Sequence, residues 1–274
     1  MGIKNSIKSI AIGSFDGIHL AHQQLIGEAE AVVVIEKNRA YITHGYRRRD
    51  YLDKPIFFYH FEKIKGLSPK EFIKKIEEDF PKLKKIVVGY DFRFGYKKRG
   101  DTKVLKELFN GEVLVIDEVK YRGISIHSCI IKEIIKRGKI KLTNRLLNHP
   151  YKIVGSLIKG QGLGAKELVP TLNLDVKYYI LPKSGVYITK TFIKNRWLNS
   201  LTFLGDRKTT DGKFSIETHI LNMDIGKLKD KTDIEVEFYS LLRENRKFKN
   251  LKELKSQIEY DIEEAIEYFK LKTY

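Results

Sequence analysis

Cysteine is almost absent from this sequence, whose 274 residues include only Cys129. A single thiol excludes an internal disulfide and any metal site built from several cysteines. Long apolar runs are also missing, since none approaches the roughly 18 residues that a membrane-spanning helix needs. The polar start of the chain, Met1–Ser9, does not have the pattern of a signal peptide. We therefore predict a cytoplasmic protein without a membrane partner.

Acidic residues are fewer than basic ones, since the sequence has 35 Asp and Glu against 52 Lys and Arg and a net charge of +17. A basic surface attracts polyanions, which include nucleotides and nucleic acids. The lysines are spread along the chain, and no familiar nucleic-acid recognition module accompanies them. We therefore expect no nucleic-acid partner, although a basic nucleic-acid-binding protein on an α/β scaffold is an alternative. We expect a monomer or a weak oligomer.

The first half of the chain alternates short apolar runs with segments of helical pattern. Such runs suit the buried strands of a parallel sheet, so the alternation predicts an open parallel α/β sheet. The basic segment 47–50 is expected to be a solvated loop. The expected strands are 9–13, 31–36, 56–59, 85–89 and 111–119, and the expected helices are 21–31, 68–79, 102–109, 130–138 and 142–147.

The pattern changes near residues 148–150, after which short alternating runs are separated by glycine-containing turns. Such a pattern predicts an antiparallel barrel or sandwich, closed by one amphipathic helix over about 250–269. The length favours two modest domains, which we place at 1–147 and 148–274. The expected strands of the second domain are 151–158, 172–176, 185–192, 200–204, 215–221 and 234–241.

A glycine-containing loop follows the first expected strand and carries two histidines three residues apart, His19 and His22. The start of a helix favours phosphate through its unpaired N–H groups and its dipole. Imidazoles placed there can donate hydrogen bonds to a phosphoryl group as negative charge builds up on it. By itself an HxxH pair is more often accidental, and Gly13 and Gly17 could simply serve a tight turn. Zinc is not expected, because no cysteine or glutamate nearby completes a site.

The string GSFDGIHLAHQQLI resembles the signature of nucleotidylyl transferases, whose hallmark is H-x-G-H. Together with VGYDFRFG at 88–95, it resembles the adenylyltransferase half of the bacterial bifunctional riboflavin kinase/FAD synthetase family. The resemblance implies a Rossmann-like domain with a parallel sheet and with His19 and His22 as catalytic residues. It also implies ATP contacts at Gly13, Phe15, Asp16 and Gly17, and flavin contacts at Asp91, Phe92 and Arg93.

Residues 126–132 depart from the family pattern I-S-S-T-x-x-R, whose hydroxyls and arginine contact the ATP phosphates. Ser128 agrees with this pattern, and the resemblance implies that it binds ATP together with Lys132. Lysine keeps the positive charge of arginine but loses its two-pronged grip, and cysteine is a weaker hydrogen-bonding group than threonine. A kinase with a weakened adenylyltransferase domain is therefore the alternative. The residues that differ from the pattern are His127, Cys129, Ile130 and Lys132.

A second glycine-rich stretch, within 155–164, precedes the tetrapeptide Pro170-Thr171-Leu172-Asn173. The backbone of such a stretch can approach phosphate. A threonine hydroxyl and an asparagine carbonyl two residues apart on a strand point the same way, and Mg²⁺ prefers oxygen ligands. From these residues alone, an ordinary hairpin turn with a capping asparagine is an equally good interpretation.

This stretch resembles the riboflavin kinase domain, whose hallmark is G-x-x-L-G-F-P-T-A-N, and further matches follow in the family's order at 184–187, 205–207, 217–221 and 238–248. The resemblance implies an antiparallel β-barrel with a terminal helix. It implies Glu217 as the general base and Mg²⁺ held by Thr171 and Asn173. It also implies ATP contacts at Gly160, Gly162, Gly164, Lys166 and Pro170, and flavin contacts at Arg207 and Arg243.

Taken together, the two resemblances cover nearly the whole chain. They imply an enzyme that phosphorylates riboflavin to FMN and then adenylylates FMN to FAD, with ATP as co-substrate and release of pyrophosphate in the second step. Mg²⁺ would assist the phosphorylation of riboflavin, because phosphoryl transfer depends on positioning and charge neutralisation.

Overall fold

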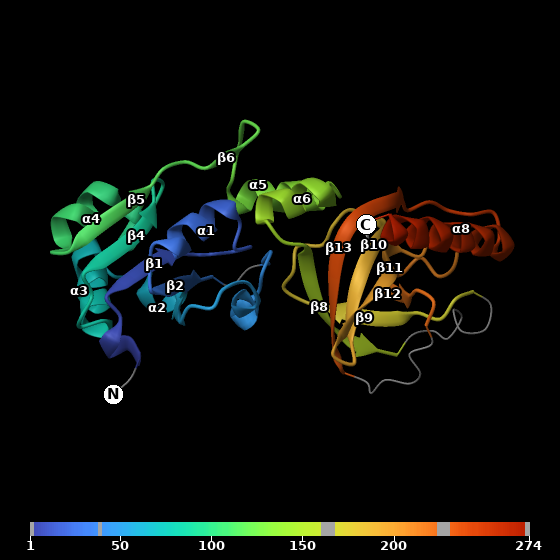
Figure 1. Ribbon diagram of the computed structural model, residues 1–274, viewed down its shortest axis with the longest axis horizontal. Coiled ribbons are helices and arrows are strands. Elements are labelled where there is room, and N and C mark those ends of the chain that lie inside the picture. Colours follow the sequence, from blue (N-terminus) through green and yellow to red (C-terminus); the bar gives the residue numbers. More distant parts are fainter. Residues whose placement is uncertain (1–2, 38–39, 160–167, 224–230, 272–274) are drawn as a thin grey trace. The chain divides into compact units, whose positions relative to one another are not determined.

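The computed structural model describes residues 3–37, 40–159, 168–223 and 231–271. The chain divides into two compact units, residues 1–130 and 131–274 (Figure 1). Our expected domain boundary at residue 147 therefore stays a prediction, since the helices just before it group with the second unit.

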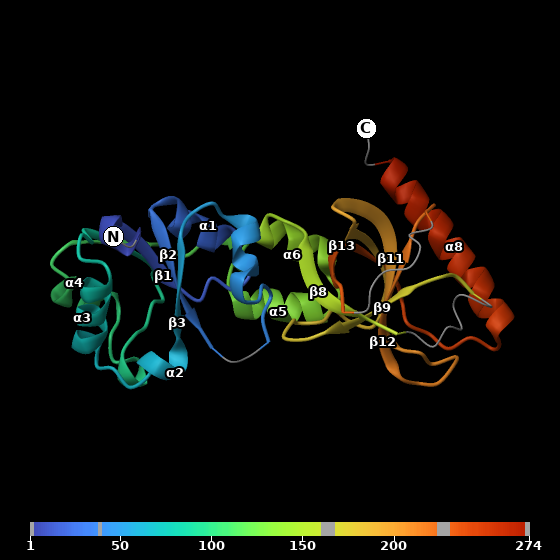
Figure 2. The same ribbon diagram turned by 90° about the horizontal axis from the view of Figure 1, so that it is seen from below.

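The first unit is built on a five-stranded parallel sheet with the strand order β3-β2-β1-β4-β5, and Figure 2 shows its strands β1, β2 and β3. This confirms the expected α/β sheet. The direction of connection reverses between β1 and β4, and open sheets bind ligands at the carboxyl ends of the strands at such a point. The strands are β1 (Ser9–Gly13), β2 (Ala31–Glu36), β3 (Ile56–His60), β4 (Lys85–Gly89) and β5 (Glu112–Ile116).

Alternate side chains of these strands supply two apolar cores, because successive residues of a strand point to opposite faces. Ile10 and Ile12 belong to the core that includes Phe72 of α3, whereas Ala11 packs with Leu25 of α1. The helices are α1 (Leu20–Gly27), α2 (Phe61–Ile64), α3 (Pro69–Asp79) and α4 (Thr102–Leu108), with 3₁₀ turns η1 (Ile3–Ser6), η2 (Gly45–Tyr51) and η3 (Tyr96–Lys98) and a small hairpin of β6 (Lys120–Tyr121) and β7 (Ile124–Ser125).

Three expectations for this unit were wrong. The strand expected over 111–119 is shorter, because β5 ends at Ile116. Helix α1 ends at Gly27 and not at residue 31, because the chain must become extended to pair β2 with β1. The segment expected as a solvated loop forms η2, and Arg48 within it is 0% exposed. Its charge is paired with Glu36 at 3.1 Å, and such pairing is what allows an arginine to be buried.

Two short helices follow, α5 (Ser128–Lys136) and α6 (Ile140–Leu147). Gly138 separates them with a φ of 70°, a conformation that favours glycine. Helix α6 packs on β8 (Tyr151–Ile158) and β13 (Asp233–Glu244). The side chain of Asn144 donates to the Phe238 carbonyl at 2.8 Å and accepts from the Tyr151 N–H at 2.8 Å, so α6 is joined to the second unit by specific bonds.

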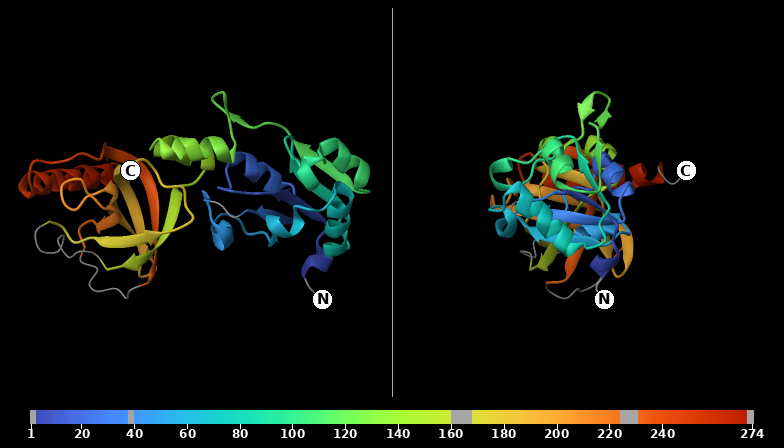
Figure 3. Two further views of the ribbon diagram at one scale, coloured as in Figure 1. Left: turned by 180° about the vertical axis from the view of Figure 1, so that it is seen from behind. Right: turned by 90° about the vertical axis from the view of Figure 1, so that its left-hand side faces the viewer.

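The second unit is a closed barrel of six antiparallel strands in the order β10-β11-β12-β9-β8-β13, so the barrel and not the sandwich is the correct alternative. Helix α8 (Leu251–Lys270) lies along its outer side (Figure 3). Its N-cap is Asn250, whose side chain accepts from the Glu253 N–H at 2.9 Å.

In the described part of the chain no helix is long and apolar enough to cross a membrane. The remaining strands are β9 (Leu172–Val176), β10 (Gly185–Ile193), β11 (Arg196–Asp206) and β12 (Phe214–Ile220).

Strands β10, β11 and β12 have two chemically different faces. One face carries fully buried hydroxyl groups that bond to one another at 2.8–2.9 Å, which satisfies these buried polar atoms. The other face is apolar, and α8 covers it with side chains that include Ala265 and Phe269. Glu217 therefore lies on the face that α8 shares, because Thr218 next to it belongs to the hydroxyl face. The hydroxyl network consists of Thr189, Thr191, Ser200, Thr202 and Thr218.

Candidate active sites

The loop between β1 and α1 is tightly folded at the carboxyl end of β1. Phe15, Gly17 and Ile18 have φ values of 46°, 98° and 42°, a region that costs energy for residues with a side chain. Phe15 and Asp16 are both 0% exposed, so neither the side chain nor the backbone of these two expected ATP contacts reaches solvent. The loop is thus a tight turn with the side chains of Phe15 and Asp16 packed inside the unit.

The structure brings together the two histidines and Ser128, as the sequence motifs implied. The imidazoles of His19 and His22 stack with their centroids 3.5 Å apart. His19 Nδ1 accepts the His22 backbone N–H at 3.3 Å and so caps α1, which leaves the proton on Nε2 in the neutral ring. That Nε2 lies 3.3 Å from Ser128 Oγ, which itself donates to the Asp16 carbonyl at 2.8 Å.

His22 is held in its neutral form. Burial lowers its pKa well below the usual value, and the nearby His19, Arg48 and His127 lower it further. A charged imidazole is disfavoured where water is excluded and other positive groups are close. At neutral pH, His22 is therefore a neutral imidazole that can donate one hydrogen bond.

The segment after β4 carries the expected flavin contacts at the neighbouring strand end. Asp91 is exposed, and its Oδ2 lies 3.7 Å from His127 Nδ1. His127 Nε2 lies 3.0 Å from the Tyr90 hydroxyl. Phe92 packs against the core of the sheet, and Arg93 donates to the carbonyl of Phe92 at 2.9 Å. His127, which departs from the family pattern, thus adds an imidazole at this edge of the sheet.

The other expected ATP contacts are placed as follows. Lys132 lies one helical turn after Ser128 on α5, so the two side chains share a face of that helix. Cys129 is exposed. Four expected contacts lie outside the described residues, namely Gly160, Gly162, Gly164 and Lys166.

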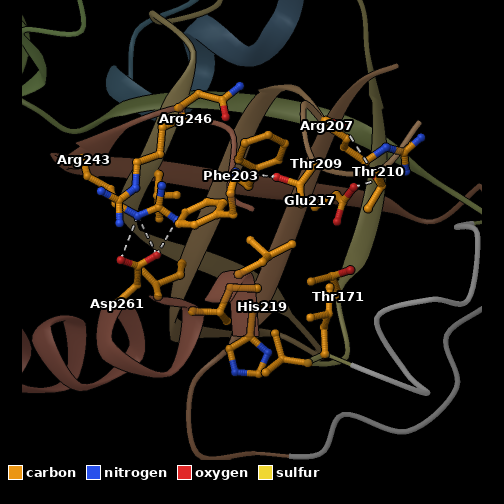
Figure 4. A pocket seen from close by; sticks show the side chains of 18 of the residues that line it. Thr171, Phe203, Arg207, Thr209, Thr210, Glu217, His219, Arg243, Arg246 and Asp261 are labelled. Carbon is orange, nitrogen blue, oxygen red and sulfur yellow. Dashed lines mark hydrogen bonds and ion pairs between the residues drawn. The ribbon is translucent and has the colours of Figure 1, made fainter. Parts of the chain in front are cut away.

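A cavity opens between the outer face of the barrel and α8 in the second unit (Figure 4). Its walls include Val186, Leu201 and Phe203 from the barrel and Leu254 and Ile258 from the helix. These apolar walls suit a flat aromatic ligand, and a few polar groups fix its orientation. The predicted residues that line this cavity are Thr171, Arg207, Glu217 and Arg243.

The expected base and one expected metal ligand, Asn173, lie on adjacent strands, and the other ligand, Thr171, directly precedes β9. Glu217 of β12 is paired directly with Asn173 of β9, and directly opposed residues of an antiparallel pair share a face. Asn173 lines a second cavity on β9 and β12, and Arg207 lines both cavities. His219 Nδ1 bonds to the Pro170 carbonyl at 2.8 Å, so β12 also fixes the chain just before Thr171.

The two expected flavin-binding arginines both contact carboxylates that sequence reasoning missed. Arg207 forms a two-pronged pair with Asp211, with both distances 2.9 Å, and reaches Glu217 Oε1 at 3.4 Å. Arg243 binds Asp261 of α8, its Nη2 lying 2.7 Å from Oδ2. Asp261 is 2% exposed. Its position among the apolar residues of the terminal helix was a signal in the sequence, because a carboxylate on an apolar face needs a partner.

The Arg243–Asp261 pair gives a stability prediction. We expect Asp261→Ala to lower the free energy of unfolding of the barrel unit by about 3 kcal/mol, because one partner of a buried ion pair is removed. Urea unfolding followed by the fluorescence of Trp197, the single tryptophan, measures this effect. Glu263→Ala on the exposed side of α8 is the matched control. An unchanged unfolding midpoint in the Asp261 variant would contradict the prediction.

Comparison with known proteins identifies both halves of the chain. Residues 147–269 match the riboflavin kinase family model, and residues 48–130 match the FAD synthetase model; the histidine loop precedes the second match. A bifunctional riboflavin kinase/FMN adenylyltransferase of Buchnera aphidicola is 29% identical over 97% of this chain and 96% of its own length. The Bacillus subtilis protein of the same name is 28% identical over 95% of this chain and 92% of its own length.

A solved structure extends the similarity to the whole fold. A Streptococcus pneumoniae protein described as a macrolide-efflux protein has a TM-score of 0.81 and 25% identity, and the match covers 96% of this chain and 97% of that chain. Both domain models occur in the family's order, and the relatives are matched over nearly their full length. The chain therefore belongs to the bifunctional riboflavin kinase/FMN adenylyltransferase family.

Proposed function

We propose that this chain makes FAD from riboflavin in two ATP-dependent steps, the first in the barrel unit and the second in the α/β unit. The observation that carries the proposal is the presence of two separate, chemically suited sites: Glu217 opposite Asn173 beside the barrel cavity, and the stacked pair of His19 and His22 at the sheet edge. The test supplies riboflavin, ATP and Mg²⁺ and measures FMN, FAD and pyrophosphate.

In the first step, the primary hydroxyl of the riboflavin side chain attacks the γ-phosphorus of ATP, and ADP leaves. Glu217 takes the proton of that hydroxyl as the new bond forms. The isoalloxazine ring occupies the apolar cavity, and the ribityl chain extends towards Thr171 and Asn173. Arg207 orients the Glu217 carboxylate through its contact at 3.4 Å.

Mg²⁺ is part of the proposal for the barrel site. The Thr171 hydroxyl and the Asn173 side-chain carbonyl are the hard oxygen donors that this ion prefers, and the His219 bond to the Pro170 carbonyl fixes the chain just before them. When bound, Mg²⁺ would neutralise charge on the ATP phosphates. The two protein oxygens would leave the remaining positions of the ion to phosphate and water.

In the second step, a phosphate oxygen of FMN attacks the α-phosphorus of ATP, and pyrophosphate leaves. Negative charge increases on the α-phosphate oxygens during this step, and His19 and His22 donate hydrogen bonds to it at the start of α1. Asp91 lies at the flavin or adenosine side of the site. Lys132 binds the leaving pyrophosphate as a point charge.

Lys132 provides a prediction for this second site. We expect Lys132→Arg to preserve or improve FAD formation from FMN, because arginine restores the two-pronged phosphate grip of the family pattern. The rate of pyrophosphate release with saturating FMN measures the effect, and Lys136→Arg at the exposed end of α5 is the control. A strong loss of FAD formation in Lys132→Arg would contradict the prediction that arginine can take the place of Lys132.

The second candidate function is riboflavin kinase alone. The observation that favours it is the altered segment around Ser128, where His127, Cys129 and Lys132 replace the family's residues. Wild-type protein that makes FMN rapidly but no FAD from supplied FMN would establish this reading. Cytoplasmic localisation and a monomeric or weakly oligomeric state stay predictions, which fractionation and light scattering would test.

A further inference from the structure

Arg48 is a buried cation that the reaction described above does not use. It is 0% exposed, whereas the neighbouring Arg49 is exposed. Arginine is almost never fully buried unless its charge is paired and its donors are bonded. The contacts of its guanidinium therefore show what this residue does in the unit.

The guanidinium of Arg48 joins three segments of the α/β unit. Its Nε donates to the Phe15 carbonyl at 3.1 Å. Its Nη1 donates to the Gly45 carbonyl at 2.9 Å and to Glu36 Oε1 at 3.1 Å. Phe15 belongs to the histidine loop, Glu36 ends β2, and Gly45 begins η2. Arg48 therefore ties the loop to the body of the sheet.

The histidine loop needs such support because its backbone is strained. Phe15 and Ile18 have positive φ values of 46° and 42°, and such residues persist only where the surroundings fix them. Asp16 supplies part of the support, since its Oδ1 accepts the N–H groups of Ile42 and Thr43 at 2.7 and 3.1 Å. The bond from Arg48 to the Phe15 carbonyl supplies another part, four residues before the histidine that caps α1.

The positive charge of Arg48 also acts on His22. Burial is the largest cause that lowers the pKa of His22, and His19, Arg48 and His127 are the titratable and charged groups that add to it. Within the described residues, His22 Nδ1 and Arg48 Nη2 are buried nitrogens without a hydrogen-bond partner. A buried cation behind the loop thus opposes the protonation of His22.

We propose that Arg48 is a positioning residue for adenylyl transfer, which holds the loop of His19 and His22 from inside the unit through its bonds to the Phe15 carbonyl, the Gly45 carbonyl and Glu36. This inference rests on the proposed function of the α/β unit. A preorganised loop needs no rearrangement when charge develops on the α-phosphate. Arg48 touches no substrate in this scheme, and it acts through the Phe15 carbonyl and through its field at His22.

The kinetic test compares three variants of the full-length chain with FMN, ATP and Mg²⁺ supplied. We expect Arg48→Gln to lower kcat/KM for FAD formation about 100-fold, the usual cost of misplacing catalytic groups by about 1 Å. Arg48→Lys keeps the charge but loses the branched donors, so a loss of about tenfold is expected. Arg49→Gln, at the exposed neighbour, should stay within about twofold of wild type. Riboflavin phosphorylation should be unchanged in all three.

The second measurement separates this role from mere support of the fold. The imidazole of His22 is titrated by NMR, with His22→Asn used to assign its signal. Removing a nearby positive charge raises the pKa of a histidine, so Arg48→Gln should shift the His22 midpoint upward. Arg48→Lys should leave the midpoint low. A merely structural role would lower the melting temperature without this dependence on the charge.

Three results would overturn the inference. They are wild-type FAD formation in folded Arg48→Gln, an unshifted His22 midpoint in that variant, and, if Arg48→Gln does not fold, wild-type FAD formation in Arg48→Lys. Failure of the proposed function is distinguishable, because the wild-type protein would then make no FAD. In that case the His22 titration still decides whether Arg48 controls the loop.

Discussion

Glu217→Gln is expected to lower FMN formation at least ~100-fold, which is the usual worth of a positioned general base. Glutamine keeps the length of the side chain and can still accept the hydrogen bond from Arg207. It cannot take the proton of the ribityl hydroxyl, so the loss falls on the chemical step. Riboflavin binding in the adjoining cavity should be preserved, and kcat should fall much more than KM changes.

The matched control for this variant is Glu263→Gln, an exposed carboxylate on α8 in the same unit. Its FMN formation should equal that of the wild type. FAD formation from supplied FMN should survive in Glu217→Gln, because that step takes place in the other unit. Near-normal kinase turnover in Glu217→Gln would remove Glu217 from the role of general base.

His22→Ala is expected to abolish FAD formation while riboflavin phosphorylation continues. The substitution removes a neutral donor at the start of α1 and the stacking partner of His19, whose ring centroid lies 3.5 Å away. Loss of one preorganised donor alone costs on the order of 100-fold or more in rate. Disturbing His19 should add to this loss, since both imidazoles are proposed to act on the same developing charge.

The assay for His22→Ala supplies FMN, ATP and Mg²⁺ and follows FAD together with pyrophosphate. His60→Ala is a suitable control, because His60 is exposed in the same unit and its side chain makes no capping bond to α2. The control should form FAD at the wild-type rate. Substantial FAD formation in His22→Ala would refute the role of the histidine pair in adenylyl transfer.

The secondary structure of both units was largely predictable, because buried strands and amphipathic helices leave periodic patterns in the sequence. The capped start of α3 shows this at the level of single residues. Ser68 accepts the Glu71 N–H at 3.3 Å, and the Glu71 carboxylate accepts the Ser68 N–H at 2.7 Å, as a Ser-Pro-x-Glu start predicts. The end of α1 was missed although the expected start of β2 at residue 31 was correct, because the apolar pattern of α1 does not mark its last residue.

The candidate site residues were predictable where they belong to contiguous motifs. His19 and His22 belong to one motif and Ser128 belongs to another. The structure brings the two motifs together, with His19 Nε2 3.3 Å from Ser128 Oγ. Arg48 was misassigned to a solvated loop, because its neighbours Arg47 and Arg49 make the segment strongly basic. Local composition cannot show that one arginine of three turns inward to Glu36.

The sequence by itself determined the class of each unit, the order of the strands along the chain and the motifs that carry the chemistry, since these depend on local patterns. Only the tertiary structure decided that the barrel closes, that Glu217 faces Asn173, and that Arg207, Arg243 and Arg48 have their charges paired. The physical reason is that strand register and ion pairing join residues far apart in the chain. Such contacts are determined by packing and by the cost of burying an unpaired charge. A local sequence pattern predicts neither of these.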